Sequence, residues 1–195
     1  RSYRDKGLYL NLMEEIEFIL ESAKESMLNA TKHLERELLN IRAGKANPIM
    51  LSNIMIDYYG SQTPLSQVAN ISTPDSRTLN IQPWEKGLMG DIEKAILIAN
   101  IGFTPMNNGD SIIINIPPMT EERRIQLVKI AKNESENAKV SIRSSRKEAN
   151  DDVKKSEISD DMKKNLESDI QTLTDSFIKK TDDLFLNKEK EILTV

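Results

Sequence analysis

The sequence predicts an α+β protein in which a small α/β domain is inserted between the first and second helices of a long three-helix bundle. Apolar residues recur every three or four positions in residues 13–46 and again in 119–195, the spacing of amphipathic helices. All seven prolines lie in residues 47–118 between these stretches, and six of the seven glycines lie in residues 44–118, with β-branched clusters among them. The chain is therefore predicted to form two domains that differ in composition and secondary structure.

The first helix is expected to begin at Met13 and to run for about eight turns. It should end near Gly44, because Asn47-Pro48 follows and a residue before proline disfavours helical backbone. Residues 1–12 precede the clear pattern and are assigned to an N-terminal extension of unknown role. The predicted core face consists of Ile16, Leu20, Ala23, Met27, Ala30, Leu34, Leu38 and Ile41.

The inserted domain, residues 47–118, is predicted to contain four short strands and one helix. The strands are "NIMIDYYG", "QVANIS", "TLNIQP" and "SIIINIPP", and the helix is "DIEKAILIAN". Tyr58-Tyr59-Gly60 is interpreted as a strand end with one ring packed inward, and "PMNNGD" as a turn. Trp84 and Phe103 are assigned to the local core.

Two more helices are predicted in residues 119–195, one after Thr120 and one capped by Ser159. Their apolar faces can be buried if they pack with the first helix as one bundle. The chain then passes between the two domains twice, and these connections are predicted to form a hinge. The hinge residues are Ala46, Asn47, Pro48, Pro117 and Pro118.

A basic stripe is predicted on the second helix of a chain whose net charge is −4. Residues 120–158 carry ten basic and eight acidic side chains. A row of cations on a helix attracts phosphate backbones, but it is also common on a solvated helix face with internal ion pairs. Arg42 and Lys45 extend the stripe if the first two helices pack antiparallel. The stripe itself consists of Lys132, Lys139, Arg143, Arg146, Lys147 and Lys154.

The sequence lacks the residues and motifs that several kinds of chemistry require. Cysteine is absent, which excludes disulfides and thiolate metal sites, and the single histidine, His33, has no partner with which to bind a metal. No apolar run is long enough to cross a membrane. The sequence contains no phosphate-binding loop, dinucleotide fingerprint or nucleophile elbow. We therefore expect neither an enzyme nor a bound cofactor or metal.

The order of the motifs closely resembles the ribosome recycling factor family. The matching segments are "NIRAGKANP", "IDYYGSQTPLSQVANIS", "SRTLNIQPWEK", "IEKAI", "IPPMTEERRIQLVK", "KVSIRSSRKEAND" and "KEKEI". The resemblance implies an L-shaped, monomeric two-domain factor that binds the large ribosomal subunit after termination. With elongation factor G and GTP, it splits the post-termination complex in a bacterial cytoplasm or in an organelle of bacterial descent. A helical adaptor or co-chaperone that binds proteins without RNA is the alternative from another class.

The resemblance also implies which residues contact ribosomal RNA. Arg143, Arg146 and Lys147 correspond to basic positions of the family's second helix, and Arg42 and Lys45 to its basic corner. Lys139 is added to this set from the charge pattern. Two of these positions, Lys45 and Lys147, carry lysine where the family commonly has arginine, which keeps the charge but loses bidentate geometry. Ile113 also stands where an arginine is frequent.

Overall fold

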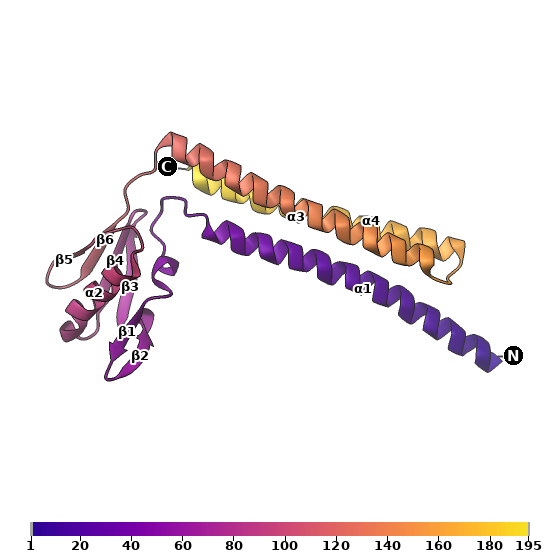
Figure 1. The fold of residues 1–195 in the computed structure, drawn as a ribbon, viewed down its shortest axis with the longest axis horizontal. Helices are drawn as coiled ribbons and strands as arrows, with labels where there is room; N and C mark the ends of the chain where they lie inside the picture. Colours follow the sequence, from indigo (N-terminus) through magenta and orange to yellow (C-terminus); the bar gives the residue numbers. More distant parts are fainter. Residues whose placement is uncertain (1, 195) are drawn as a thin grey trace. The chain divides into compact units, whose positions relative to one another are not determined.

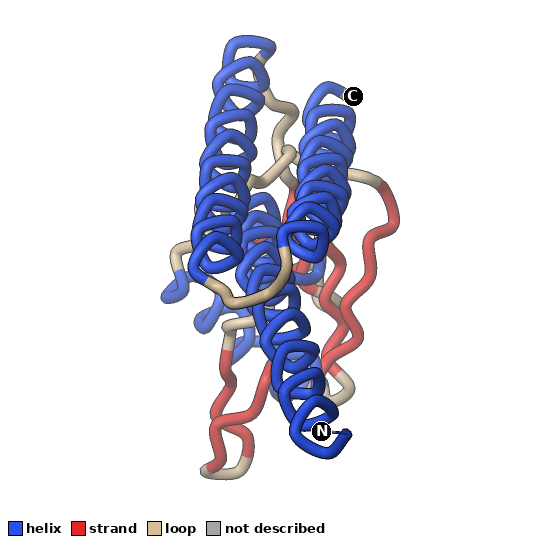
Figure 2. Tube along the Cα trace, turned by 90° about the vertical axis from the view of Figure 1, so that its right-hand side faces the viewer, coloured by secondary structure: helices blue, strands red, loops and turns tan. Residues whose placement is uncertain are grey.

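A computed structural model describes residues 2–194 and divides the chain into two compact units (Figure 1). Unit 1 combines Arg1–Ile41 with Glu122–Val195, and unit 2 is Arg42–Glu121. The protein is α+β, with long helices in unit 1 and a small sheet domain in unit 2, which confirms the predicted fold class. Strands, drawn in red in Figure 2, occur in unit 2.

Unit 1 is a bundle of three long helices, α1 (Ser2–Asn40), α3 (Glu121–Lys155) and α4 (Asp160–Leu193). All three helices contribute to shared apolar clusters, because each presents a buried face at helical spacing. Ser159 caps α4 as predicted, since its hydroxyl accepts a hydrogen bond from the amide of Met162 at 3.3 Å. The clusters join Ile19, Ala23 and Met27 of α1, Ile142, Ala149 and Val153 of α3, and Leu166, Ile170 and Phe177 of α4.

The first helix is longer at its N-terminal end than predicted. It begins at Ser2 rather than Met13, because residues 2–12 contain no proline and continue the helical backbone. Apolar side chains in this stretch, such as Tyr3 and Leu10, are exposed, and packing against the core begins at Leu12. The sequence pattern therefore located the start of burial and missed the start of the helix.

Unit 2 contains a hairpin and a four-stranded antiparallel sheet. The hairpin is β1 (Met55–Tyr58) with β2 (Ser61–Pro64). The sheet has the order β3-β4-β6-β5. Its strands are β3 (Ala69–Asp75), β4 (Thr78–Pro83), β6 (Ile112–Asn115) and β5 (Pro105–Asn107). The helices are α2 (Met89–Ala99) and the short 3-10 segments Pro48–Leu51, Leu65–Gln67 and Lys86–Leu88.

The core of unit 2 lies where α2 meets the inward residues of the sheet. Ile92 and Ile96 of α2 are fully buried in the same cluster as Leu79 and Ile81 of β4. This alternation along β4 is the period-2 pattern of a half-buried strand. Trp84 does not join this core: its side chain is 68% exposed, so its assignment to the local core was wrong.

The first and last segments of unit 2 are both hydrogen-bonded to the turn between β3 and β4, at Ser76 and Arg77. The amide of Ala46 donates to the carbonyl of Ser76 at 2.8 Å, and the amide of Ile116 donates to the carbonyl of Arg77 at 2.8 Å. Asn47 caps the following 3-10 helix by accepting from the amide of Ile49 at 3.0 Å. Residues 46–116 are thus tied together within unit 2.

No helix within residues 2–194 combines the length and apolarity needed to span a membrane.

Candidate nucleic-acid interface

The basic residues in the second half of α3, from Arg143 to Lys154, lie mainly outside the arc of the helix that packs into the bundle. Buried positions on α3 recur every three or four residues from Leu127 to Val153 and leave the remaining faces to solvent. Arg143, Lys147 and Lys154 are exposed on one such face, and Arg146 is half-buried at its edge. The same periodicity that builds the core therefore also presents these cations.

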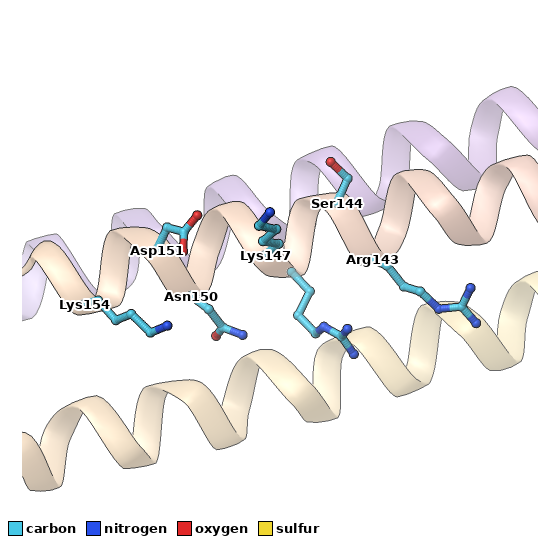
Figure 3. A pocket seen from close by; sticks show the side chains of 7 residues that line it. Arg143, Ser144, Lys147, Asn150, Asp151 and Lys154 are labelled. Atoms are coloured by element: carbon cyan, nitrogen blue, oxygen red, sulfur yellow. The ribbon is translucent and has the colours of Figure 1, made fainter.

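Four of the cations line one open hollow along α3 (Figure 3). Arg143, Asn150 and Lys154 extend toward α4, whereas Ser144 and Asp151 lie on the other side of α3. The lining set contains four cations and a single carboxylate, so the hollow has a net positive charge. Its residues are Arg143, Ser144, Arg146, Lys147, Asn150, Asp151 and Lys154.

These cations are not neutralised by the bundle. Among the residues that the structure describes, no carboxylate forms an ion pair with Arg143, Arg146 or Lys147. The group extends from residue 143 to residue 154, which is about 16 Å along the helix axis. A rigid row of unpaired cations of this length can contact several phosphates of one nucleic-acid strand.

The opposite flank of α3 has the reverse charge. The hydroxyls of Ser26 on α1 and Ser145 on α3 lie 2.6 Å apart, within hydrogen-bonding distance, at a hollow between these helices. Glu148 and Asp152 line the same hollow. The charges of α3 are thus separated onto two flanks, and an anionic ligand is attracted to one flank and repelled by the other.

Lys139 does not share the exposure of the other candidates. Its side chain is only 12% exposed, and its ammonium is ion-paired with Asp182 of α4 and lies 3.7 Å from Glu136. Lys132, the other early member of the stripe, lies 3.4 Å from Glu136 and 4.9 Å from the ring centroid of Phe185. The first part of the predicted stripe therefore stabilises the bundle, and the unpaired group begins at Arg143.

One cation near the hollow was missed by sequence reasoning. The ammonium of Lys163 on α4 donates to the carbonyl of Lys154 at 3.3 Å, so a second helix brings charge to this end of the group. Its position follows from the short connection between α3 and α4, residues 156–159. Pairing the end of one helix with the start of the next would have identified it.

Arg42 and Lys45 belong to unit 2, whereas the residues that line the hollow on α3 belong to unit 1. The guanidinium of Arg42 donates to the carbonyl of Ile101 at 3.3 Å, which ties this side chain to the loop after α2. Lys45 is half-buried. These two residues therefore belong to a different unit from the stripe on α3.

The chemistry that this arrangement offers is anion binding. Guanidinium groups can grip phosphate oxygens with two parallel hydrogen bonds, while lysine ammonium groups supply charge without that fixed geometry. Within residues 2–194, no group of three or more histidine, aspartate or glutamate side chains is placed to hold a metal ion.

Comparison with known proteins gives one consistent family. The family model described as ribosome recycling factor matches residues 34–193. The ribosome-recycling factor of Flavobacterium psychrophilum is 59% identical over 187 residues, which cover 94% of this chain and 100% of the relative. That of Christiangramia forsetii is 57% identical over 183 residues, with the same coverage. That of Bacillus licheniformis is 46% identical over 181 residues, covering 91% of this chain and 98% of the relative.

Solved structures agree with this result. A solution structure of a ribosome recycling factor has a TM-score of 0.76 and 35% identity, and the match covers 93% of this chain and 98% of that one. A second similar structure belongs to a set of models for the T. thermophilus ribosome recycling factor and the E. coli elongation factor G bound to the E. coli post-termination complex. Its TM-score is 0.60 at 40% identity, over 92% of this chain and 99% of that one.

Proposed function

This chain belongs to the ribosome recycling factor family, and from this we propose that it binds the large ribosomal subunit after termination. With elongation factor G and GTP, it then splits the post-termination complex and releases the ribosome from messenger RNA. The similar structure described with elongation factor G on a post-termination complex supports this pairing of partners. The bacterial relatives favour a bacterial cytoplasm as the compartment.

The observation that supports RNA binding most directly is the unpaired basic group on α3. Arg143 and Arg146 contact phosphates of ribosomal RNA in this proposal, and Lys147 adds a point charge beside them. Lys139 is left out of the contact surface because Asp182 holds its ammonium. Arg42 and Lys45 act separately, as contacts made by unit 2.

The factor works mechanically and catalyses no reaction in this proposal. Elongation factor G hydrolyses GTP and moves unit 2 while unit 1 stays bound to RNA. A body that is fixed at one end and displaced at the other strains the bridges between the subunits. The chain therefore needs a point of bending between its two units.

The proposed bending points lie just outside the tied segment of unit 2. Ala46, Asn47 and Pro48 were predicted as hinge residues, but hydrogen bonds fix Ala46 to Ser76 and place Asn47 at a helix cap. We therefore place the first bend in residues 42–45. Pro117 and Pro118 stay in the second bend, because both are exposed and follow the last tied residue, Ile116.

A disulfide across these connections tests the bending. A Cβ on Gly44 would lie 2.9 Å from Cγ of Met119, so Gly44→Cys and Met119→Cys place two thiols together in a chain without other cysteines. The oxidised protein is expected to bind the large subunit normally and to split ribosomes slowly. The same protein after reduction is the matched control. Equal splitting rates for the oxidised and reduced forms would rule out the bending.

Sedimentation of post-termination complexes tests the function as a whole. Mixed with this protein, elongation factor G and GTP, the complexes are expected to separate into subunits, and to remain intact when any one of the three is omitted. Arg143→Ala with Arg146→Ala should abolish the separation at equal protein concentration. Intact complexes with the wild-type chain, in the presence of a working family member as control, would refute the proposal.

A further inference from the structure

The turn between β1 and β2 holds a tyrosine in a backbone conformation that tyrosine rarely adopts. Tyr58 pairs with Ser61 across the hairpin, so Tyr59 and Gly60 are its two central residues, with φ of 51° and 82°. Two-residue turns with positive φ at both positions favour Asn-Gly or Asp-Gly, because bulky side chains are strained there. The side chain of Tyr59 is 83% exposed, so packing within unit 2 compensates little of this strain.

Two tyrosine hydroxyls fix one carboxylate beside this turn. Tyr58 donates to Oε1 of Glu85 at 2.8 Å, and Tyr59 donates to Oε2 at 3.3 Å. The two rings meet edge to face, with centroids 4.5 Å apart. The hydrogen bond to Glu85 raises the pKa of Tyr58 above its ordinary value. Each carboxylate oxygen retains a lone pair for a second donor, so Glu85 is oriented and still able to bind.

The surroundings of this cluster favour a cationic ligand. The ring of Tyr59 is accessible beside the Glu85 carboxylate, because this residue is 83% exposed. Residues 46–118 carry three basic and six acidic side chains, so this part of unit 2 repels phosphate. Exposed aromatic rings beside an oriented carboxylate are the groups that attract a cation, through the ring face and through charged hydrogen bonds.

We propose that Tyr58, Tyr59 and Glu85, here called the tyrosine–glutamate cluster, bind an arginine side chain of a protein partner. The guanidinium stacks on the exposed ring of Tyr59 and donates hydrogen bonds to Glu85. Arginine fits better than lysine because its planar group can stack and bind a carboxylate at the same time. The inference rests on the proposed function, since the partner is a protein that meets unit 2 on the post-termination ribosome.

Replacement of the strained tyrosine tests the cluster without endangering the fold. Tyr59→Asn removes the ring and creates the favoured Asn-Gly turn, so the melting temperature should stay the same or rise. The splitting rate is expected to fall about tenfold, as for the loss of an interface anchor, while affinity for the isolated large subunit is unchanged. Ile98→Gln, at an apolar position on α2 that is 74% exposed, is the control and should split normally.

The sign of a second variant identifies the ligand. Glu85→Gln keeps a hydrogen-bond acceptor and removes the charge, so an arginine ligand predicts slower splitting. A nucleic-acid ligand predicts equal or faster splitting, because a carboxylate that repels phosphate is gone. Faster or unchanged splitting by Glu85→Gln would therefore overturn the proposal, as would normal splitting by Tyr59→Asn. Failure of the wild-type chain to split ribosomes would instead reject the proposed function itself.

A peptide titration tests the arginine specificity directly. Gly-Arg-Gly is added to the full ¹⁵N-labelled chain, and Gly-citrulline-Gly, which has nearly the same shape without the charge, serves as control. The amide signals of Tyr59, Gly60 and Glu85 are expected to shift with the arginine peptide, and this shift should disappear in Tyr59→Asn. Equal shifts with both peptides, or no shift at these amides, would contradict an arginine site.

Discussion

Removing both arginines from the hollow is expected to weaken binding to the large ribosomal subunit strongly. Arg143 and Arg146 line the same positive hollow and form no ion pair within the described part of the chain, so their guanidinium groups are available to phosphate. A charge-assisted hydrogen bond at an exposed site contributes about 1.5 kcal/mol, so the loss of two such contacts costs about 3 kcal/mol. The dissociation constant should therefore rise about 140-fold.

The salt dependence of binding tests the same reasoning independently. Each lost phosphate contact makes the slope of log K against log salt concentration shallower by about 0.9, so the double alanine variant should lose about 2 units of slope. Arg143→Lys with Arg146→Lys should retain the slope and lose part of the affinity, because lysine keeps charge without the bidentate geometry. Fluorescence titration of labelled protein with large subunits over a range of salt concentrations measures both quantities.

A matched control variant tests whether binding depends on the position of the removed charges or only on the net charge of the protein. Lys32→Ala with Arg36→Ala also removes two positive charges, but from exposed positions on α1. This control should bind within about fivefold of wild type, because distant exposed charges are screened by salt. If both double variants lost the same affinity and the same slope, net charge would explain the binding and the hollow on α3 would not.

Three further predictions follow from other contacts. Lys139→Met removes the ion pair with Asp182 and should lower the free energy of unfolding by about 1 kcal/mol, since the carboxylate is half exposed, while the affinity for the large subunit stays unchanged. Thermal melting measures the stability and the binding titration measures the affinity. Weaker binding by this variant would show that Lys139 contacts RNA. Gly44→Ala should lower the free energy of unfolding by about 1 to 2 kcal/mol, because φ is 70° at this position and the new Cβ would lie 2.9 Å from Cγ of Met119. An unchanged midpoint of urea unfolding would contradict this strain. The pKa of Asp75 lies below its ordinary 3.8, because the Arg77 amide donates a hydrogen bond to its carboxylate. The ionised carboxylate should stabilise its turn above pH 3.8, and this stabilisation should be lost as the pH falls through the lowered pKa of Asp75. A carboxyl NMR titration with a midpoint at or above 3.8 would disprove this prediction.

The helical parts of the fold could be predicted because their pattern is local and repeated. Ala23, Met27 and Leu34 of the core face predicted for the first helix are buried in the structure, and Ser159 caps α4 where expected. Such positions depend only on the spacing along one helix and on local capping chemistry. The strands β2 and β5 were missed, the first because its sequence "SQTP" is polar and contains proline. The turn assigned to "PMNNGD" was wrong for its first half, which forms β5, because this strand is only three residues long and ends at the turn-forming residue Asn107.

What sequence reasoning could not supply was the contact between distant segments. Lys139 matched the basic stripe by angle, but its partner Asp182 lies on another helix and becomes visible only once the bundle packs. Trp84 was assigned to a core by its apolar character, although its position after β4 leaves the side chain exposed. The strain at Tyr59 was also hidden, because the sequence does not show which two residues form the centre of the hairpin turn.

Light scattering of post-termination ribosomes mixed with this protein, elongation factor G and GTP tests the central claim most directly. The wild-type chain is expected to cause a rapid fall in scattering as the subunits separate, and the Arg143→Ala/Arg146→Ala variant is expected to cause none at the same concentration. The Lys32→Ala/Arg36→Ala control should behave as wild type. A constant signal with wild type would contradict recycling by this chain, and an equal fall with the arginine variant would contradict the role of the hollow on α3.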